Sequence, residues 1–276
     1  MRRYKIITLL FTIIITPTNF YPRSLTKPTT IIFDIPGVLF KENRAILRQK
    51  IGIRSLASYA VTHWKNPSTV CFDLLETMSK HPAHQPSVLL KFKEKIMPRC
   101  IVEWQQGYKT CDQVRTELVN FIEQMAEQNY FSSMQEKNLT QHIIKFIFDA
   151  QQLPELTKPV MPMVDLAKQL KKAGYQLLLL ANVPHELYST IKTNYPEIIE
   201  LFDGSIVSCQ THILKPDKQM FKKLLDTYQL NPCQCILIDE KEESVAAAQE
   251  LDILGITYQK KPLLIKKLKK LGIIIN

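Results

Sequence analysis

Apolar residues follow two different spacings along the chain, and these predict a change from helices to alternating strands and helices. Between residues 44 and 150 they recur every three or four positions, as in helices with one buried face. Prolines at 67, 82, 86 and 98 interrupt the pattern. The clearest repeats are Val114, Leu118, Phe121, Ile122 and Met125, then Ile143, Ile144, Ile147 and Phe148.

One helix start is marked inside this segment. Thr110 is followed three residues later by Gln113, the spacing at which each side chain bonds the other residue's backbone amide. We expect a helix to begin directly after Thr110.

Short apolar runs predict buried strands on both sides of the helical segment. One run precedes it at residues 31–33, and later runs are separated by helical stretches near residues 163–170, 221–225 and 245–251. This alternation predicts an α/β fold in which residues 27–43 and 155–276 form a doubly wound parallel sheet with its helices. Residues 44–154 are predicted to form a helical cap inserted into this fold. The later runs are at residues 177–180, 206–207, 236–238 and 256–258.

The first 26 residues differ in character from the rest. Residues 1–5 are basic and residues 6–16 are uncharged and mostly apolar, which is typical of a signal sequence or a short anchor. The apolar run is too short to cross a bilayer as a helix. We expect export or membrane association through this leader. The alternative is a cytoplasmic protein whose leader packs on the domain.

Composition restricts the class of protein. The chain has 276 residues, 45% hydrophobic content and a net charge of +10, so it can bury one substantial core. No zinc-finger spacing or aromatic RNA-binding motif accompanies the positive charge, and we expect no nucleic-acid partner. The six scattered cysteines predict mostly buried thiols, with disulfides left open if the chain is exported. The oligomeric state is also left open.

Polar residues follow the predicted strands at the points where each strand ends. Asp34 directly follows the run at residues 31–33. Ala181 and Asn182 follow the run at residues 177–180, and Asp239 and Glu240 follow the run at residues 236–238. Another polar segment, residues 215–217, lies just before a predicted helix. Ligands of parallel sheets bind at the carboxyl ends of the strands, so these segments predict one shared site.

In order and spacing, the four segments and the inserted helices resemble the haloacid dehalogenase-like (HAD) hydrolase superfamily, in its subgroup with a C1 cap. The likeness covers about residues 29–276. It implies that Asp34 attacks phosphorus and forms an acyl phosphate, while Lys215 holds the phosphoryl oxygens. It places Asn182, Ala181 and Gly37 beside the phosphate of a small phosphorylated substrate or ligand.

The resemblance also implies a magnesium ion. Its ligands would be the carboxylates of Asp34, Asp239 and Glu240 and the backbone carbonyl of Pro36. Hard oxygen ligands of this kind suit Mg²⁺.

Three positions depart from the pattern of the superfamily's phosphatases. Pro36 stands where they have an aspartate that protonates the leaving group and activates water, a role worth about 10²- to 10⁴-fold in rate. Ala181 replaces a hydroxyl donor, a contact worth about 3 kcal/mol in related sites. Glu240 replaces a shorter aspartate among the magnesium ligands.

Two functions therefore follow from the resemblance. The first is a phosphatase-type hydrolase with impaired or specialised activity that uses Asp34. The second is a non-catalytic protein that binds a phosphorylated ligand or partner. A dehalogenase is less favoured, because the superfamily's dehalogenases keep a serine where Ala181 stands and need no metal.

The end of the chain predicts a basic amphipathic helix. Six lysines between residues 260 and 270 are interspersed with Leu264, Ile265, Leu268 and Leu271. Such a helix either docks on the core with a solvated face or contacts an anionic membrane or a partner.

Overall fold

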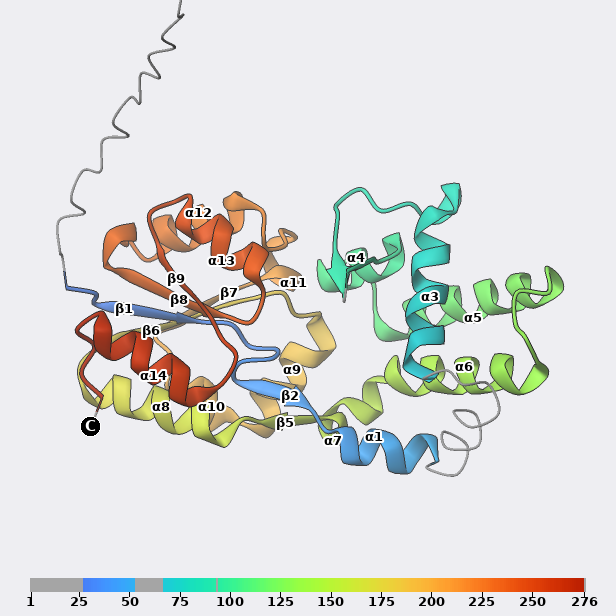
Figure 1. The fold of residues 1–276 in the computed structure, drawn as a ribbon, viewed down its shortest axis with the longest axis horizontal. Coiled ribbons are helices and arrows are strands. Elements are labelled where there is room, and N and C mark those ends of the chain that lie inside the picture. Colours follow the sequence, from blue (N-terminus) through green and yellow to red (C-terminus); the bar gives the residue numbers. More distant parts are fainter. Residues whose placement is uncertain (1–26, 53–66, 93, 276) are drawn as a thin grey trace, which may run out of the picture.

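A five-stranded parallel sheet forms the α/β part of the molecule (Figure 1). The computed structural model describes residues 27–52, 67–92 and 94–275, so the predicted leader lies outside the described residues. The strand order β7-β6-β1-β8-β9 places the first strand in the centre, and the predicted α/β fold is confirmed. The strands are β1 (Thr30–Phe33), β6 (Gln176–Ala181), β7 (Gly204–Val207), β8 (Cys235–Asp239) and β9 (Leu254–Thr257).

Helices cover both faces of the sheet because successive side chains of each strand point to opposite sides. Ile31 and Phe33 of β1 belong to one apolar cluster and Ile32 to the other. The first cluster packs against α8 (Met161–Lys172), α9 (His185–Asn194), α10 (Pro196–Ile199) and α14 (Lys261–Lys270). The second packs against α12 (Lys218–Thr227) and α13 (Glu242–Gln249).

The segment between the first and second strands of the sheet is mainly helical and has its own apolar cluster. Val114, Leu118, Phe121, Ile122 and Met125 are all buried in it, as their spacing predicts. Its helices are α1 (Arg44–Ile51), α3 (Pro67–Lys80), α4 (Arg99–Gln105), α5 (Cys111–Glu127), α6 (Met134–Ile147) and α7 (Leu153–Leu156).

Short strands occur where the chain leaves and re-enters the α/β part. β2 (Phe40–Glu42) pairs antiparallel with β5 (Thr157–Pro159). Within the helical segment, β3 (Lys91–Phe92) and β4 (Lys95–Ile96) form a small hairpin that the helical spacing does not predict. Each of its strands has two residues, too few for an alternating pattern to be recognised.

The predicted start of α5 is confirmed. The Thr110 hydroxyl accepts a hydrogen bond from the backbone amide of Gln113 at 3.3 Å. The Gln113 side chain in turn accepts one from the backbone amide of Thr110 at 2.9 Å. This capping box fixes the end of α5 that faces the α/β part, where Cys111 N donates to Glu186 of α9 at 2.7 Å.

Most of the cysteines are buried thiols, as predicted. All six are free, and five are buried. Burial raises the pKa of Cys71 and Cys235 to about 12, which keeps both thiols protonated at neutral pH. Within the described ranges, no helix combines the length and apolarity needed to cross a bilayer.

Candidate functional site

The central strand and its neighbours bring the predicted acids together at the carboxyl edge of the sheet. β1 pairs in parallel with β6 on one side and with β8 on the other. Asp34 follows β1 directly and its backbone amide donates to Ile238 of β8 at 3.0 Å. Asp239 is the last residue of β8, so both carboxylates emerge side by side.

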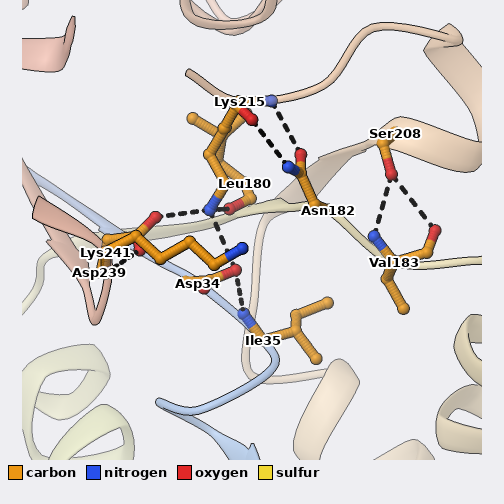
Figure 2. A network of polar contacts seen from close by, with 9 residues as sticks. All are labelled: Asp34, Ile35, Leu180, Asn182, Val183, Ser208, Lys215, Asp239 and Lys241. Atoms are coloured by element: carbon orange, nitrogen blue, oxygen red, sulfur yellow. Dashed lines mark hydrogen bonds and ion pairs between the residues drawn. The ribbon is translucent and has the colours of Figure 1, made fainter. Parts of the chain in front are cut away.

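Lys215 reaches this edge from the loop between α11 (Ser208–Thr211) and α12, and its ammonium group has three acceptors (Figure 2). Lys215 Nζ lies 3.0 Å from Asp34 Oδ1 and 2.6 Å from Asp239 Oδ2. It also donates to the carbonyl of Leu180 at 2.7 Å. The amine is therefore held between the two acids that the sequence assigns to the site.

Asn182 fixes the backbone of Lys215. Its amide nitrogen donates to Lys215 O at 2.9 Å, and its amide oxygen accepts from Lys215 N at 2.8 Å. A second N–H of the amide group stays available. Asn182 thus positions Lys215, and its predicted contact with phosphate stays a prediction.

The carboxylates of the site outnumber its cations. Burial raises the pKa of Asp34 well above its ordinary value, Lys215 opposes this shift, and the charges of Asp239 and Glu240 add to it. Burial also raises the pKa of Glu240. Burial alone would lower the pKa of Lys215, but Asp34 and Asp239 raise it above the ordinary value. The lysine stays charged, and the three acids share a surplus of negative charge.

Three carboxylates could hold a metal ion. Oxygen atoms of Asp34, Asp239 and Glu240 lie within 4.8 Å of one another. Glu240 Oε2 is buried without a hydrogen-bond partner, so one hard oxygen ligand is left unsatisfied. Both the donor set and the surplus charge fit Mg²⁺.

The three remaining predicted residues lie around the acids. Gly37 has φ +81°, and a Cβ there would lie 2.4 Å from Glu240 Oε2, so the glycine allows Glu240 to lie against the turn. Ala181 ends β6 and is fully buried in the apolar cluster. Pro36 is half-buried between Asp34 and the turn. The role of the Pro36 carbonyl as a metal ligand stays a prediction.

The site is largely covered by protein. The Asp34 side chain is 5% exposed, that of Lys215 2% and that of Asp239 0%. A small part of the Asp34 side chain thus reaches solvent, and the amine of Lys215 points directly at the Asp34 carboxylate. Access to Asp34 is therefore narrow.

Ser208 is a residue of this region that sequence reasoning missed. It follows β7 and is fully buried. Its hydroxyl accepts a hydrogen bond from Val183 N at 2.9 Å (Figure 2). It also donates to Gln105 O of α4 at 2.6 Å. Ser208 therefore joins the loop after β6 to the helical segment. Its position directly after an apolar run was the available signal.

A second junction lies nearby. The His212 ring stacks on Tyr108 with centroids 4.4 Å apart, and the Gln106 side chain donates to His212 O at 2.9 Å. Together with Ser208, these contacts fix the loop between α4 and α5 over α11.

Comparison with protein families gives one match that spans most of the chain. A sequence profile described as haloacid dehalogenase-like hydrolase matches residues 28–252.

Curated relatives match over shorter stretches. The chain is 27% identical to sesquiterpene phosphatase astK of Aspergillus oryzae over 99 residues, which is 36% of this chain and 50% of the relative. It is 25% identical to bifunctional epoxide hydrolase 2 of Rattus norvegicus over 112 residues, 40% of this chain and 20% of that one. The chain thus spans half or less of the length of these relatives.

Solved structures share the fold over most of the chain. A predicted HAD-like family hydrolase from Porphyromonas gingivalis superimposes with a TM-score of 0.53 at 18% identity, covering 90% of this chain and 98% of that one. A HAD family enzyme from Bacteroides thetaiotaomicron, in complex with magnesium and inorganic phosphate, has a TM-score of 0.51 at 15% identity, covering 84% and 94%. At these identities the likeness concerns the fold alone.

Proposed function

The chain belongs to the haloacid dehalogenase-like hydrolase family, and from that premise we propose that it is a phosphatase-type hydrolase with Asp34 as nucleophile. The observation that carries the proposal is the position of Lys215 Nζ, 3.0 Å from Asp34 and 2.6 Å from Asp239. A buried cation beside the nucleophilic carboxylate can stabilise the negative charge of an incoming phosphoryl group. Small phosphorylated compounds are the proposed substrates.

In the proposed first step, an Asp34 oxygen forms a bond to phosphorus while the bond to the leaving oxygen breaks. The electron pair departs with the leaving oxygen, and the product on Asp34 is an acyl phosphate. Lys215 contributes charge to the phosphoryl oxygens. The acids Asp34, Asp239 and Glu240 would hold Mg²⁺, which when bound supplies further positive charge for the phosphoryl group.

Pro36 determines which substrates can react. It offers no proton to the leaving oxygen and no base to the water of the second step. The leaving groups of aryl and acyl phosphates, an aryloxide and a carboxylate, depart without needing a proton. We therefore propose these two classes as the reactive substrates. Hydrolysis of the acyl phosphate on Asp34 then limits turnover.

We propose that residues 44–154 act as a cap that excludes water from the site. Support comes from the junction of Ser208 with Gln105, since it ties α4 to the strand end beside Asn182.

A rapid-mixing assay with a nitrophenyl phosphate and Mg²⁺ tests the proposal. We expect a burst of nitrophenolate close to one equivalent per chain, followed by a slow phase. Asp34→Asn should abolish the burst. Pro36→Asp should accelerate the slow phase by about 10²- to 10⁴-fold, and the control Pro36→Ala should not.

The alternative is a non-catalytic protein that binds a phosphorylated ligand. It is favoured by Ala181, which is fully buried and has no hydroxyl, and by the narrow access to Asp34. In that case the chain gives neither burst nor turnover, while phosphate or vanadate still raises its melting temperature. The double change Pro36→Asp with Ala181→Ser would then restore no activity.

A further inference from the structure

The exposed side of α14 carries a concentration of positive charge. Lys266, Lys267, Lys269 and Lys270 are exposed, while Leu264 and Leu268 on the opposite side are buried in the core. No Asp or Glu occurs between residue 253 and the end of the sequence. None of these lysines forms an ion pair with any other residue in the described ranges. Their charge is therefore available to a partner.

A hollow of about 230 Å³ lies beside this row of lysines. It is lined by Lys266, Lys267 and Lys270 together with Thr257 and Gln259. Ammonium, hydroxyl and amide groups of this kind can all donate to phosphate oxygens. Leu263 also lines the hollow and is 41% exposed, so an apolar side chain stands next to the cations.

The two ends of the described chain meet at the end of α14. Thr29 O accepts from Gln176 N, and the adjacent Tyr175 hydroxyl accepts from Ile274 N at 3.1 Å. Figure 1 shows the start of β1 and the C-terminus at the same end of the molecule. The sequence before β1 contains Arg2, Arg3, Lys5 and the apolar run 6–16. Basic and apolar segments from both ends of the chain are thus joined to one end of the molecule.

We propose that the lysine face of α14 binds the surface of a bilayer that contains anionic phospholipid. Lysines next to exposed Leu263 and Ile274 combine the charge and the apolar groups that interfacial helices use. Single-stranded nucleic acid is less well matched, because Tyr258 is the only aromatic residue between 253 and 276 and is partly buried. The C-terminal end of α14 lies at the amino end of β6, where Ile274 N donates to Tyr175, whereas Thr257 and Gln259 of the hollow lie at the carboxyl end of β9.

Vesicle sedimentation with the full chain tests the proposal. The vesicles contain phosphatidylcholine alone or with phosphatidylserine. The variant Lys266→Gln with Lys267→Gln removes two charges from the proposed face. Its control is Lys222→Gln with Lys223→Gln, which removes an exposed pair from α12 on the other side of the sheet. Because all four lysines are exposed, neither variant should lose stability. Melting temperatures equal to that of the wild type will verify that both variants fold.

We expect the wild-type chain to prefer the anionic vesicles. Each lysine near an anionic surface contributes about five-fold, or about 1 kcal/mol, so the α14 variant, which loses two lysines, should lose about 25-fold in partitioning. The α12 control should lose less than three-fold. Added salt should weaken the wild-type binding.

Three results would overturn the proposal. They are equal losses in both variants, no loss in either, or tighter binding to single-stranded RNA than to the vesicles with that binding lost in the α14 variant. The Asp34→Asn chain should bind vesicles like the wild type. A failure of the proposed catalysis is therefore distinguishable from a failure of membrane binding.

Discussion

Gly37 shows how a single residue controls the arrangement of the acids. Its φ of +81° lies in the left-handed region, which costs other residues about 1 to 2 kcal/mol. In addition, a Cβ at this position would meet the carboxylate of Glu240 at 2.4 Å. Any side chain here would strain the turn and displace one of the three proposed metal ligands.

A pair of glycine substitutions separates these two effects. Gly174 has a similar φ of +87°, but a Cβ there would meet nothing within 4 Å. We expect Gly37→Ala and Gly174→Ala to lower the free energy of unfolding by similar amounts, about 1 to 2 kcal/mol, in urea without metal. Only Gly37→Ala should also weaken the stabilisation by Mg²⁺. Equal magnesium responses in the two variants would show that Glu240 does not depend on Gly37.

At the scale of elements, the sequence predicts what depends on local spacing. The strands β1, β6, β7, β8 and β9 follow short apolar runs, and α5 follows its capping box and apolar repeat. The convergence of Asp34 and Asp239 follows from the strand ends, and Lys215 joins them from the loop before α12. Spacing could not predict that Asn182 would bond the backbone of Lys215, because that contact depends on how two loops pack.

The junction between α4 and α11 is another contact that no local pattern encodes. The Ser208 hydroxyl bonds a carbonyl 103 positions earlier in the chain. Ser208→Ala would leave the buried Val183 N and the partly buried Gln105 O without this partner. We expect it to lower the free energy of unfolding by about 1 to 3 kcal/mol in a urea titration.

Ser189→Ala is the matched control for that change. Ser189 is exposed on α9, and its replacement should change stability by no more than about 0.5 kcal/mol. If Ser208→Ala has as small an effect as the control, the hydroxyl does not hold the helical segment to the sheet edge.

At the scale of the whole molecule, the surplus of buried acids links metal binding to global stability. Asp34, Asp239 and Glu240 gather around one charged amine. Their mutual repulsion weakens the folded state, and a cation bound among them would relieve it. A ligand that binds only the folded chain stabilises it by about 1.4 kcal/mol at ten times its dissociation constant.

Magnesium should therefore raise the melting temperature of the chain, by about 3 °C at ten times the dissociation constant. Glu240→Gln should have two opposite effects, because it removes one of three crowded negative charges and also a metal ligand. Without metal the variant should melt at or above the wild-type temperature, and with Mg²⁺ it should gain less than the wild type. Glu243→Gln, at an exposed position three residues further along, should keep the full magnesium response. A scanning-fluorimetry titration with Mg²⁺ measures all three chains. If the wild type and both variants respond alike, Glu240 is not a metal ligand and Mg²⁺ acts elsewhere on the molecule.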